Sequence, residues 1–224
     1  MIRAALLVGV AALVAVSAAH AQQTPGWYVG LEGGWNGVTG ASSSFSTGGS
    51  TTSFTAHSSS GFAGGLTLGY EWPFNVRLEG EATLRRNDYS NLTTPTTAGT
   101  LPLSGNTVSM ALMGNVLYDF LPHTAWTPYL GFGIGGAAFT VNSLSAPALG
   151  IPSTSATLWQ FAYQGIAGVK YALSPTVSIN LDYRYFTMPN ATFMTGAVTQ
   201  LKSQYGANTV MLGIAYHGVP PKSP

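Results

Sequence analysis

The fold is decided by one alternating stretch, Val76-Arg77-Leu78-Glu79-Gly80-Glu81-Ala82-Thr83-Leu84-Arg85. Apolar or small residues occupy the even-numbered positions of this stretch, and charged or polar residues occupy the odd-numbered positions. We call each such set of alternate positions a parity. Side chains of a strand alternate between its two faces, whereas a helical period would not keep the charges in register. The stretch therefore predicts a strand with one apolar face and one charged face.

A strand of this kind fits two environments. In a soluble sheet protein the apolar face points into a core and the charges point to water. In a transmembrane barrel the apolar face meets lipid and the charges are enclosed in the lumen. The rest of the chain distinguishes these two environments.

The same alternation recurs along the chain and predicts eight strands of about eleven residues, the length that a tilted strand needs to cross a bilayer. The expected strands are 27–38, 62–72, 76–86, 107–120, 129–141, 159–171, 177–185 and 210–216.

Long and short connections alternate between the expected strands. Ser-, Thr-, Pro- or Gly-rich stretches predict long loops at 37–60, 88–104, 142–157 and 187–206. Short turns are expected at 73–75, 121–127 and 174–175. Long loops at one end and short turns at the other are typical of outer-membrane barrels, and an even strand count places both termini at the periplasmic end.

Aromatic residues cluster toward the ends of the apolar faces, as in the interfacial girdles of membrane proteins. The expected girdle residues are Trp27, Trp35, Tyr70, Trp72, Tyr118, Phe120, Trp159, Tyr171, Tyr183 and Tyr185.

The position of the charges decides between lipid and water. Only 7% of the residues are charged, against roughly 25% in soluble domains. A soluble barrel needs charges spread over its outer surface, yet the expected long loops carry only Asp88, Lys202 and, at a strand end, Arg86. Ten charges fall within the expected strands, all opposite the large apolar residues: Glu32, Glu71, Arg77, Glu79, Glu81, Arg85, Asp119, Lys170, Asp182 and Arg184.

We therefore expect an all-β protein, an eight-stranded antiparallel up-and-down transmembrane β-barrel. A cleavable signal peptide is expected at residues 1–21, because a short basic start and an apolar run precede an Ala-x-Ala site formed by Ala19 and Ala21, with cleavage before Gln22. The barrel is expected over 22–218, with a short tail at 219–224. These features indicate export to the outer membrane of a Gram-negative envelope.

Four segments resemble the small eight-stranded outer-membrane β-barrels, the family of the outer membrane protein A N-terminal domain and of opacity-protein-like barrels. The segment 115–120 resembles that family's strand ending in a Tyr-Asp-aromatic triplet, and 128–135 resembles its Pro-Tyr-x-Gly-x-Gly strand opening. Segments 161–169 and 181–185 are similar to the two strands before its last loop. The resemblance covers nearly all of the chain after the expected signal peptide.

The resemblance implies partners as well as a fold. Gly213 and Tyr216 are similar to the family's assembly signal, which implies recognition by the barrel assembly machinery, with periplasmic chaperones during export. Outer-membrane lipid and lipopolysaccharide are the expected surroundings of a monomer. The sequence departs from the family's pattern because it runs on from His217 to Pro224 instead of ending in an aromatic residue. It also contains no peptidoglycan-binding domain, so wall anchoring is not carried over.

Other chemistry has little support in the sequence. The glycines of 131–136 match a dinucleotide fingerprint by letter but lack its helix and its acidic residue. His57, His123 and His217 have no metal-ligand spacing. The absence of cysteine excludes thiolate sites, and a net charge of +1 argues against nucleic acid. We expect no catalytic, cofactor or metal site and no enzyme.

The ten in-strand charges are the candidate functional residues, because charges enclosed away from water must be paired. They form either a stabilising salt-bridged plug or a gate whose rearranged pairs open a thin water path. Glycines of the same parity are expected to relieve crowding, and under the gate hypothesis to leave gaps that hold water. These glycines are Gly30, Gly34, Gly65, Gly69, Gly131, Gly133, Gly135 and Gly168.

Three functions are consistent with these features. The first is a non-enzymatic outer-membrane barrel with a structural and surface-exposed role in the envelope. The second is a narrow pore for small solutes or ions, gated by lumen salt bridges. The third is a soluble periplasmic barrel that binds an apolar ligand and turns its apolar face inward.

Overall fold

The computed structural model describes residues 25–39, 41–47, 50–93, 100–102, 104–121, 124–146, 151–195 and 199–218. The expected signal peptide, with its cleavage residues, and most of the expected tail lie outside this part of the chain. No helix long and apolar enough to span a membrane occurs among the residues described.

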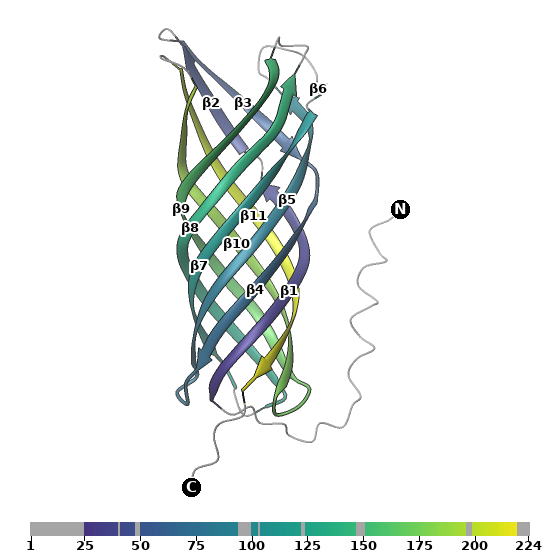
Figure 1. Ribbon diagram of the computed structural model, residues 1–224, viewed down its shortest axis with the longest axis vertical. Coiled ribbons are helices and arrows are strands. Elements are labelled where there is room, and N and C mark those ends of the chain that lie inside the picture. The colour runs from purple at the N-terminus through teal and green to yellow at the C-terminus, as the bar shows by residue number, and fades with distance from the viewer. Residues whose placement is uncertain are drawn as a thin grey trace.

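Eight long strands form a closed antiparallel barrel (Figure 1). Each strand pairs with the next along this ring, and the last strand pairs with the first. The prediction of a closed eight-stranded antiparallel barrel is confirmed. In ring order the strands are β1 (Gly26–Thr39), β4 (Gly61–Glu71), β5 (Val76–Thr93), β7 (Ser104–Asp119), β8 (Trp126–Ala146), β9 (Ile151–Ala172), β10 (Val177–Thr195) and β11 (Thr199–His217).

The pairing of β1 with β11 closes the ring. Its register places Leu31 opposite Ile214 and Trp35 opposite Val210, so apolar side chains of both strands share the outer face. A closed ring leaves no unpaired edge, which is the condition for a sheet to exist in lipid.

The extent of the strands differs from the sequence expectation. The predicted loop 37–60 contains β2 (Ala41–Thr47) and β3 (Ser50–Ser58), which pair with each other and bridge β11 to β5. The other three predicted long loops are largely strand as well, because β5, β7, β8, β9, β10 and β11 run into them and β6 (Thr100–Pro102) pairs with the end of β5. Figure 1 shows these extensions above the main barrel.

The long-loop boundaries were therefore wrong, for a physical reason. Apolar alternation marks only the part of a strand that faces lipid, whereas backbone pairing continues wherever a neighbouring strand is present. The polar extensions are rich in Ser and Thr, and the β-branched Thr is favourable in strands.

The opposite end of the barrel carries short turns. The Trp72 N–H donates to the Val76 carbonyl at 2.9 Å, and Asn75 has a positive φ of 68°, which Asn tolerates better than most residues. The Ser174 hydroxyl accepts a hydrogen bond from the Val177 N–H at 3.0 Å in the next such turn. The start of β1 and the end of β11 meet at this same end, which we call the turn end.

The two faces of the strands are separated by polarity. Large apolar side chains point outward on all eight strands, with Leu31, Leu66 and Leu212 each about 60% exposed, while the ten candidate charges are buried. A soluble barrel with an apolar interior would show the reverse. The third hypothesis, a soluble barrel that binds an apolar ligand inside, is therefore contradicted.

Aromatic rings form contacts on the outer face near the turn end. Trp27 and Tyr70 lie edge to face at 5.3 Å, and Tyr118 and Phe120 do so at 5.1 Å. Trp126, which the sequence analysis did not include among the girdle residues, contacts Tyr171 at 4.6 Å. The rings on this side form a belt of the kind that sits at a membrane interface.

Replacing Leu31 by Arg tests which solvent meets the outer face. Leu31 lies midway between Trp27 and Trp35 on β1, so we expect Leu31→Arg to cost about 2–4 kcal/mol of folding free energy in bilayers. The control Leu84→Arg lies two residues from the natural Arg86, nearer the interface, and should cost less. Reversible urea unfolding in lipid vesicles measures both, and equal losses would contradict the depth dependence.

Candidate functional site

All ten candidate charges point into the barrel, and none is more than 8% exposed: Glu32, Glu71, Arg77, Glu79, Glu81, Arg85, Asp119, Lys170, Asp182 and Arg184. The alternation of each strand sets this direction. Nine of the ten gather into two groups along the barrel axis, and Arg85 stands apart.

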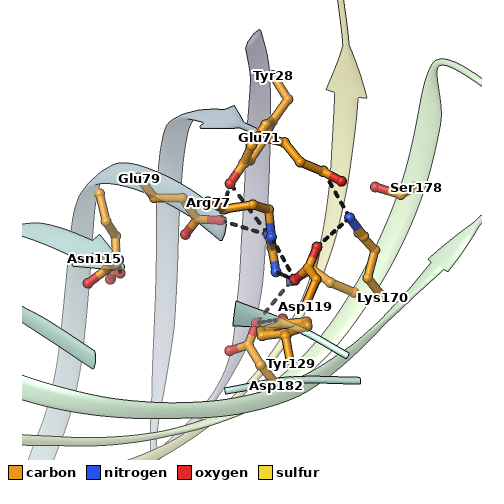
Figure 2. Close-up of polar contacts among 12 residues, drawn as sticks. Tyr28, Glu71, Arg77, Glu79, Asn115, Asp119, Tyr129, Lys170, Ser178 and Asp182 are labelled. Carbon is orange, nitrogen blue, oxygen red and sulfur yellow. Dashed lines mark hydrogen bonds and ion pairs between the residues drawn. The ribbon is translucent and has the colours of Figure 1, made fainter. Parts of the chain in front are cut away.

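The turn-end cluster consists of Glu71, Arg77, Glu79, Asp119 and Lys170 (Figure 2). Asp119 is its centre, because one carboxylate oxygen lies 2.9 Å from Arg77 Nη2 and the other lies 3.0 Å from Lys170 Nζ. Lys170 also reaches Glu71 at 3.0 Å, and Arg77 reaches Glu79 at 3.0 Å. These contacts tie β4, β5, β7 and β9 together across the lumen.

Two tyrosines complete this cluster. The Arg77 guanidinium lies over the Tyr129 ring at 4.6 Å and over the Tyr28 ring at 5.9 Å. The Tyr28 hydroxyl donates to Glu79, and the Tyr129 hydroxyl donates to Asp182 at 2.9 Å, as Figure 2 shows. Arg77 is therefore enclosed by carboxylates and aromatic faces, and Tyr129 links the turn-end cluster to the next group.

The central cluster consists of Glu32, Glu81, Asp182 and Arg184. The Arg184 guanidinium lies 2.6 Å from Glu32, 3.0 Å from Glu81 and 2.7 Å from Asp182, so one cation holds three carboxylates. Asn115 and Gln164 each donate to Glu81 Oε2 at 2.8 Å. Buried charges with this many partners fill the cross-section and avoid the penalty of isolated ions.

Arg85 has a different environment. Its guanidinium lies 4.3 Å from the centre of the Phe186 ring, and none of its three nitrogens has a hydrogen-bond partner among the described residues. Beyond it lies an apolar layer, which we call the outer layer. The outer layer contains Ala111, Met113, Ala137, Ala162, Phe186, Met188, Tyr205 and Ala207.

Several residues of this interior were absent from the predicted set. Tyr28, Tyr129, Asn115 and Gln164 all bond to its charges. The sequence signal was available, since each lies opposite the large apolar residues of its strand, and Tyr28, Asn115 and Gln164 share the parity of a charge. The outer layer lies on the same parity but is apolar. Parity alone indicates the direction of a side chain and not its polarity.

The glycines of the lumen parity are covered by neighbouring side chains. An added Cβ at Gly69 would collide with the Tyr28 ring, and one at Gly168 would lie 2.6 Å from Tyr129 and Asp182. At Gly133 the space is taken by Asn115. The expectation that these glycines leave gaps for water is therefore wrong at these positions, because each gives room to a large side chain from the adjacent strand.

A small cavity remains between the two clusters. It measures about 20 Å³ and is lined by residues that include Tyr28, Arg77, Tyr129, Lys170 and Arg184. This volume holds about one water molecule.

A serine and a histidine meet at the turn end. The Ser178 hydroxyl lies 3.0 Å from His217 Nε2, and the His217 ring stacks on Tyr28 at 5.1 Å. His217 Nδ1 has no hydrogen-bond partner, so the described residues supply no carboxylate that would orient this ring for nucleophilic catalysis. The described residues also contain no group of three or more His, Asp or Glu able to hold a metal ion.

The two residues of the expected assembly signal lie on opposite faces of β11. Gly213 faces inward, where the Asn180 side chain occupies the space beside it. Tyr216 faces outward and is 55% exposed, opposite Val29 and Val177 of the neighbouring strands.

Comparison with known proteins places this barrel among outer-membrane proteins. Residues 6–217 match the family model described as an outer membrane protein beta-barrel domain. Outer membrane protein PagN of Salmonella typhimurium is 30% identical over 179 residues, which are 69% of this chain and 72% of that protein.

A second relative and a solved structure extend the comparison. An outer membrane protein of Gluconacetobacter diazotrophicus is 30% identical over 211 residues, and the match spans 88% of this chain but only 55% of that longer protein. The crystal structure of OprG from Pseudomonas aeruginosa aligns with a TM-score of 0.65 over 88% of this chain and 99% of its own. At 18% identity, this likeness shows the fold alone.

Neutralising Asp119 tests the turn-end cluster. We expect Asp119→Asn to cost about 3–5 kcal/mol of folding free energy, because it leaves Arg77 and Lys170 buried without their shared partner. The control Arg86→Gln breaks an exposed ion pair with Asp88, 3.9 Å long, and should cost about 1 kcal/mol or less. Unfolding in detergent or lipid measures both variants, and similar small losses would show that the cluster contributes little to stability.

Proposed function

The chain belongs to the outer membrane β-barrel protein family and lies in the bacterial outer membrane, and from this premise we propose that it is a closed, non-enzymatic scaffold of the envelope. In this proposal the barrel supports envelope integrity and presents its outer end at the cell surface. It is a monomer surrounded by outer-membrane lipid and lipopolysaccharide.

The packed lumen is the observation that carries this proposal. The turn-end and central clusters join side chains from seven of the eight barrel strands, and the outer layer fills the interior beyond Arg85. The cavity between the two clusters has room for about one water molecule. Eight strands enclose a space just wide enough for side chains, so a packed interior supports a scaffold rather than a wide channel.

The outer end supports a role at the surface. The strands continue past their apolar bands into Ser- and Thr-rich extensions, which lengthen the barrel on the side opposite the turn end (Figure 1). The outer face is apolar around the whole ring, and so favours contact with lipid over contact with another protein.

The described residues supply no carboxylate that orients the His217 ring, and this supports a non-enzymatic role. The pair formed by Ser178 and His217 is buried, at 1% and 3% exposure, and lies at the turn end. A nucleophile must reach its substrate, and its histidine needs a third group to orient it.

A gated narrow pathway is the second candidate, and the arrangement around Arg184 favours it. A single guanidinium binds Glu32, Glu81 and Asp182, and the water-sized cavity lies directly beside it. A rearrangement of this residue would release three carboxylates at once beside that cavity.

Solute flux tests the scaffold. We expect liposomes that contain the protein to swell in small sugars at the rate of protein-free liposomes, because the packed clusters leave no continuous water path. A general porin inserted at equal density serves as the positive control. Swelling above the protein-free rate would contradict a closed barrel.

Charge neutralisation in planar bilayers tests the gate. If Arg184 is the gate, Arg184→Gln, Glu81→Gln and the double variant should raise ion conductance several-fold over the wild type, while Arg86→Gln on the outer face should not. Unchanged conductance in all three lumen variants would leave the scaffold as the function.

A further inference from the structure

Two buried hydrogen-bond donors near the outer layer lack acceptors. In the part of the chain that the structure describes, all three nitrogens of Arg85 and the hydroxyl of Ser109 have no hydrogen-bond partner, and each residue is 1% exposed. The two residues lie directly opposite each other on β5 and β7. Buried donors without partners are rare in folded proteins, and an ion or a water is a usual explanation.

Both carboxylate oxygens of Glu81, in the neighbouring central cluster, are already engaged. Glu81 is the carboxylate that acts most strongly on Arg85. Its Oε1 accepts from Thr83, and its Oε2 accepts from Asn115 and Gln164 and forms an ion pair with Arg184. The central cluster therefore satisfies Glu81 without using Arg85.

The polar side chains on the outer side of Arg85 are also engaged. Asn36 Oδ1 accepts from Thr209 at 2.8 Å, and Asn87 Oδ1 accepts from Asn36 at 2.6 Å. The Thr107 hydroxyl donates to the Asn87 carbonyl. The side-chain oxygens of Asn36 and Asn87 are therefore engaged within this chain of bonds and do not accept from Arg85 or Ser109.

We propose that Arg85 and Ser109 bind a small monovalent inorganic anion, chloride in the cell, inside the outer half of the barrel. Arg offers only donors and keeps its charge, and the hydroxyl of Ser109 adds a further donor from the adjacent strand. The surrounding residues limit the size of the ligand, because Phe186 covers one face of the guanidinium and Ala63 and Ala111 lie close by on β4 and β7.

The overall charge of the lumen is compatible with this site. Six acids and four bases are buried, but the surplus acids belong to the two clusters below, where their oxygens are held by Arg77, Lys170 and Arg184. Arg85 contributes to neither cluster. The anion therefore neutralises the one lumen guanidinium that has no ion-pair partner among the described residues.

Anion-dependent stability tests this site in protein extracted from outer membranes. Thermal unfolding is followed in sodium gluconate while bromide replaces gluconate at constant ionic strength. Because a ligand that binds only the folded state stabilises it, bromide at one hundred times its Kd should raise the apparent folding constant about 100-fold. The increase should disappear in Arg85→Met and weaken in Ser109→Ala. It should persist in Arg86→Met, which removes the same charge from the outer face.

A crystal grown in bromide gives an independent reading on the wild type, so the test does not depend on Arg85→Met folding. An anomalous peak within hydrogen-bond distance of Arg85 and Ser109 is the expected result. An equal bromide response in Arg85→Met and wild type would overturn the proposal. No response together with no peak would also overturn it, and would indicate water as the partner of these donors.

Discussion

The alternation of side chains between lipid and lumen is the constraint on which the rest of this structure depends. Within the apolar band, residues on one parity meet hydrocarbon, where charge is costly, and residues on the other parity enter a lumen just wide enough for side chains to fill. Closing β11 onto β1 satisfies the backbone, because no strand edge can remain unpaired in lipid. The lumen must then satisfy its own polar groups.

The polar groups of the lumen are satisfied by a few residues that each form several ion pairs. Asp119 joins Arg77 to Lys170, and Arg184 joins Glu32, Glu81 and Asp182, so each connects strands that are distant in the sequence. Some of these ion pairs link opposite walls of the barrel, as Arg184 and Glu81 do. They also explain the inward glycines, because Tyr28 and Tyr129 can reach their carboxylates only by crossing a neighbouring strand that lacks a side chain at that point.

The interior changes character along its axis. Ion pairs fill the turn end and the centre, whereas an apolar outer layer closes the opposite half, with Arg85 at the boundary between them. Packed apolar side chains leave little room for water in the outer half, and ion-paired side chains leave little room for it in the other half. Neither half therefore provides a wide aqueous path. The two arginines near this boundary differ in their partners: Arg184 pairs with three carboxylates, whereas Arg85 has no hydrogen-bond partner among the described residues.

The sequence by itself determined the number of crossing strands, the direction of each side chain and the solvent on each face. These follow from a period of two and from the placement of charges such as Arg77 and Glu79, which are local properties of the chain. The tertiary structure decided everything that depends on register across the lumen. Lys170 meets Glu71 from 99 residues away, and Arg85 is left without an acceptor, although its parity is that of the paired charges. It also decided where the strands end, because backbone pairing follows the neighbouring strand and not the polarity of the side chains.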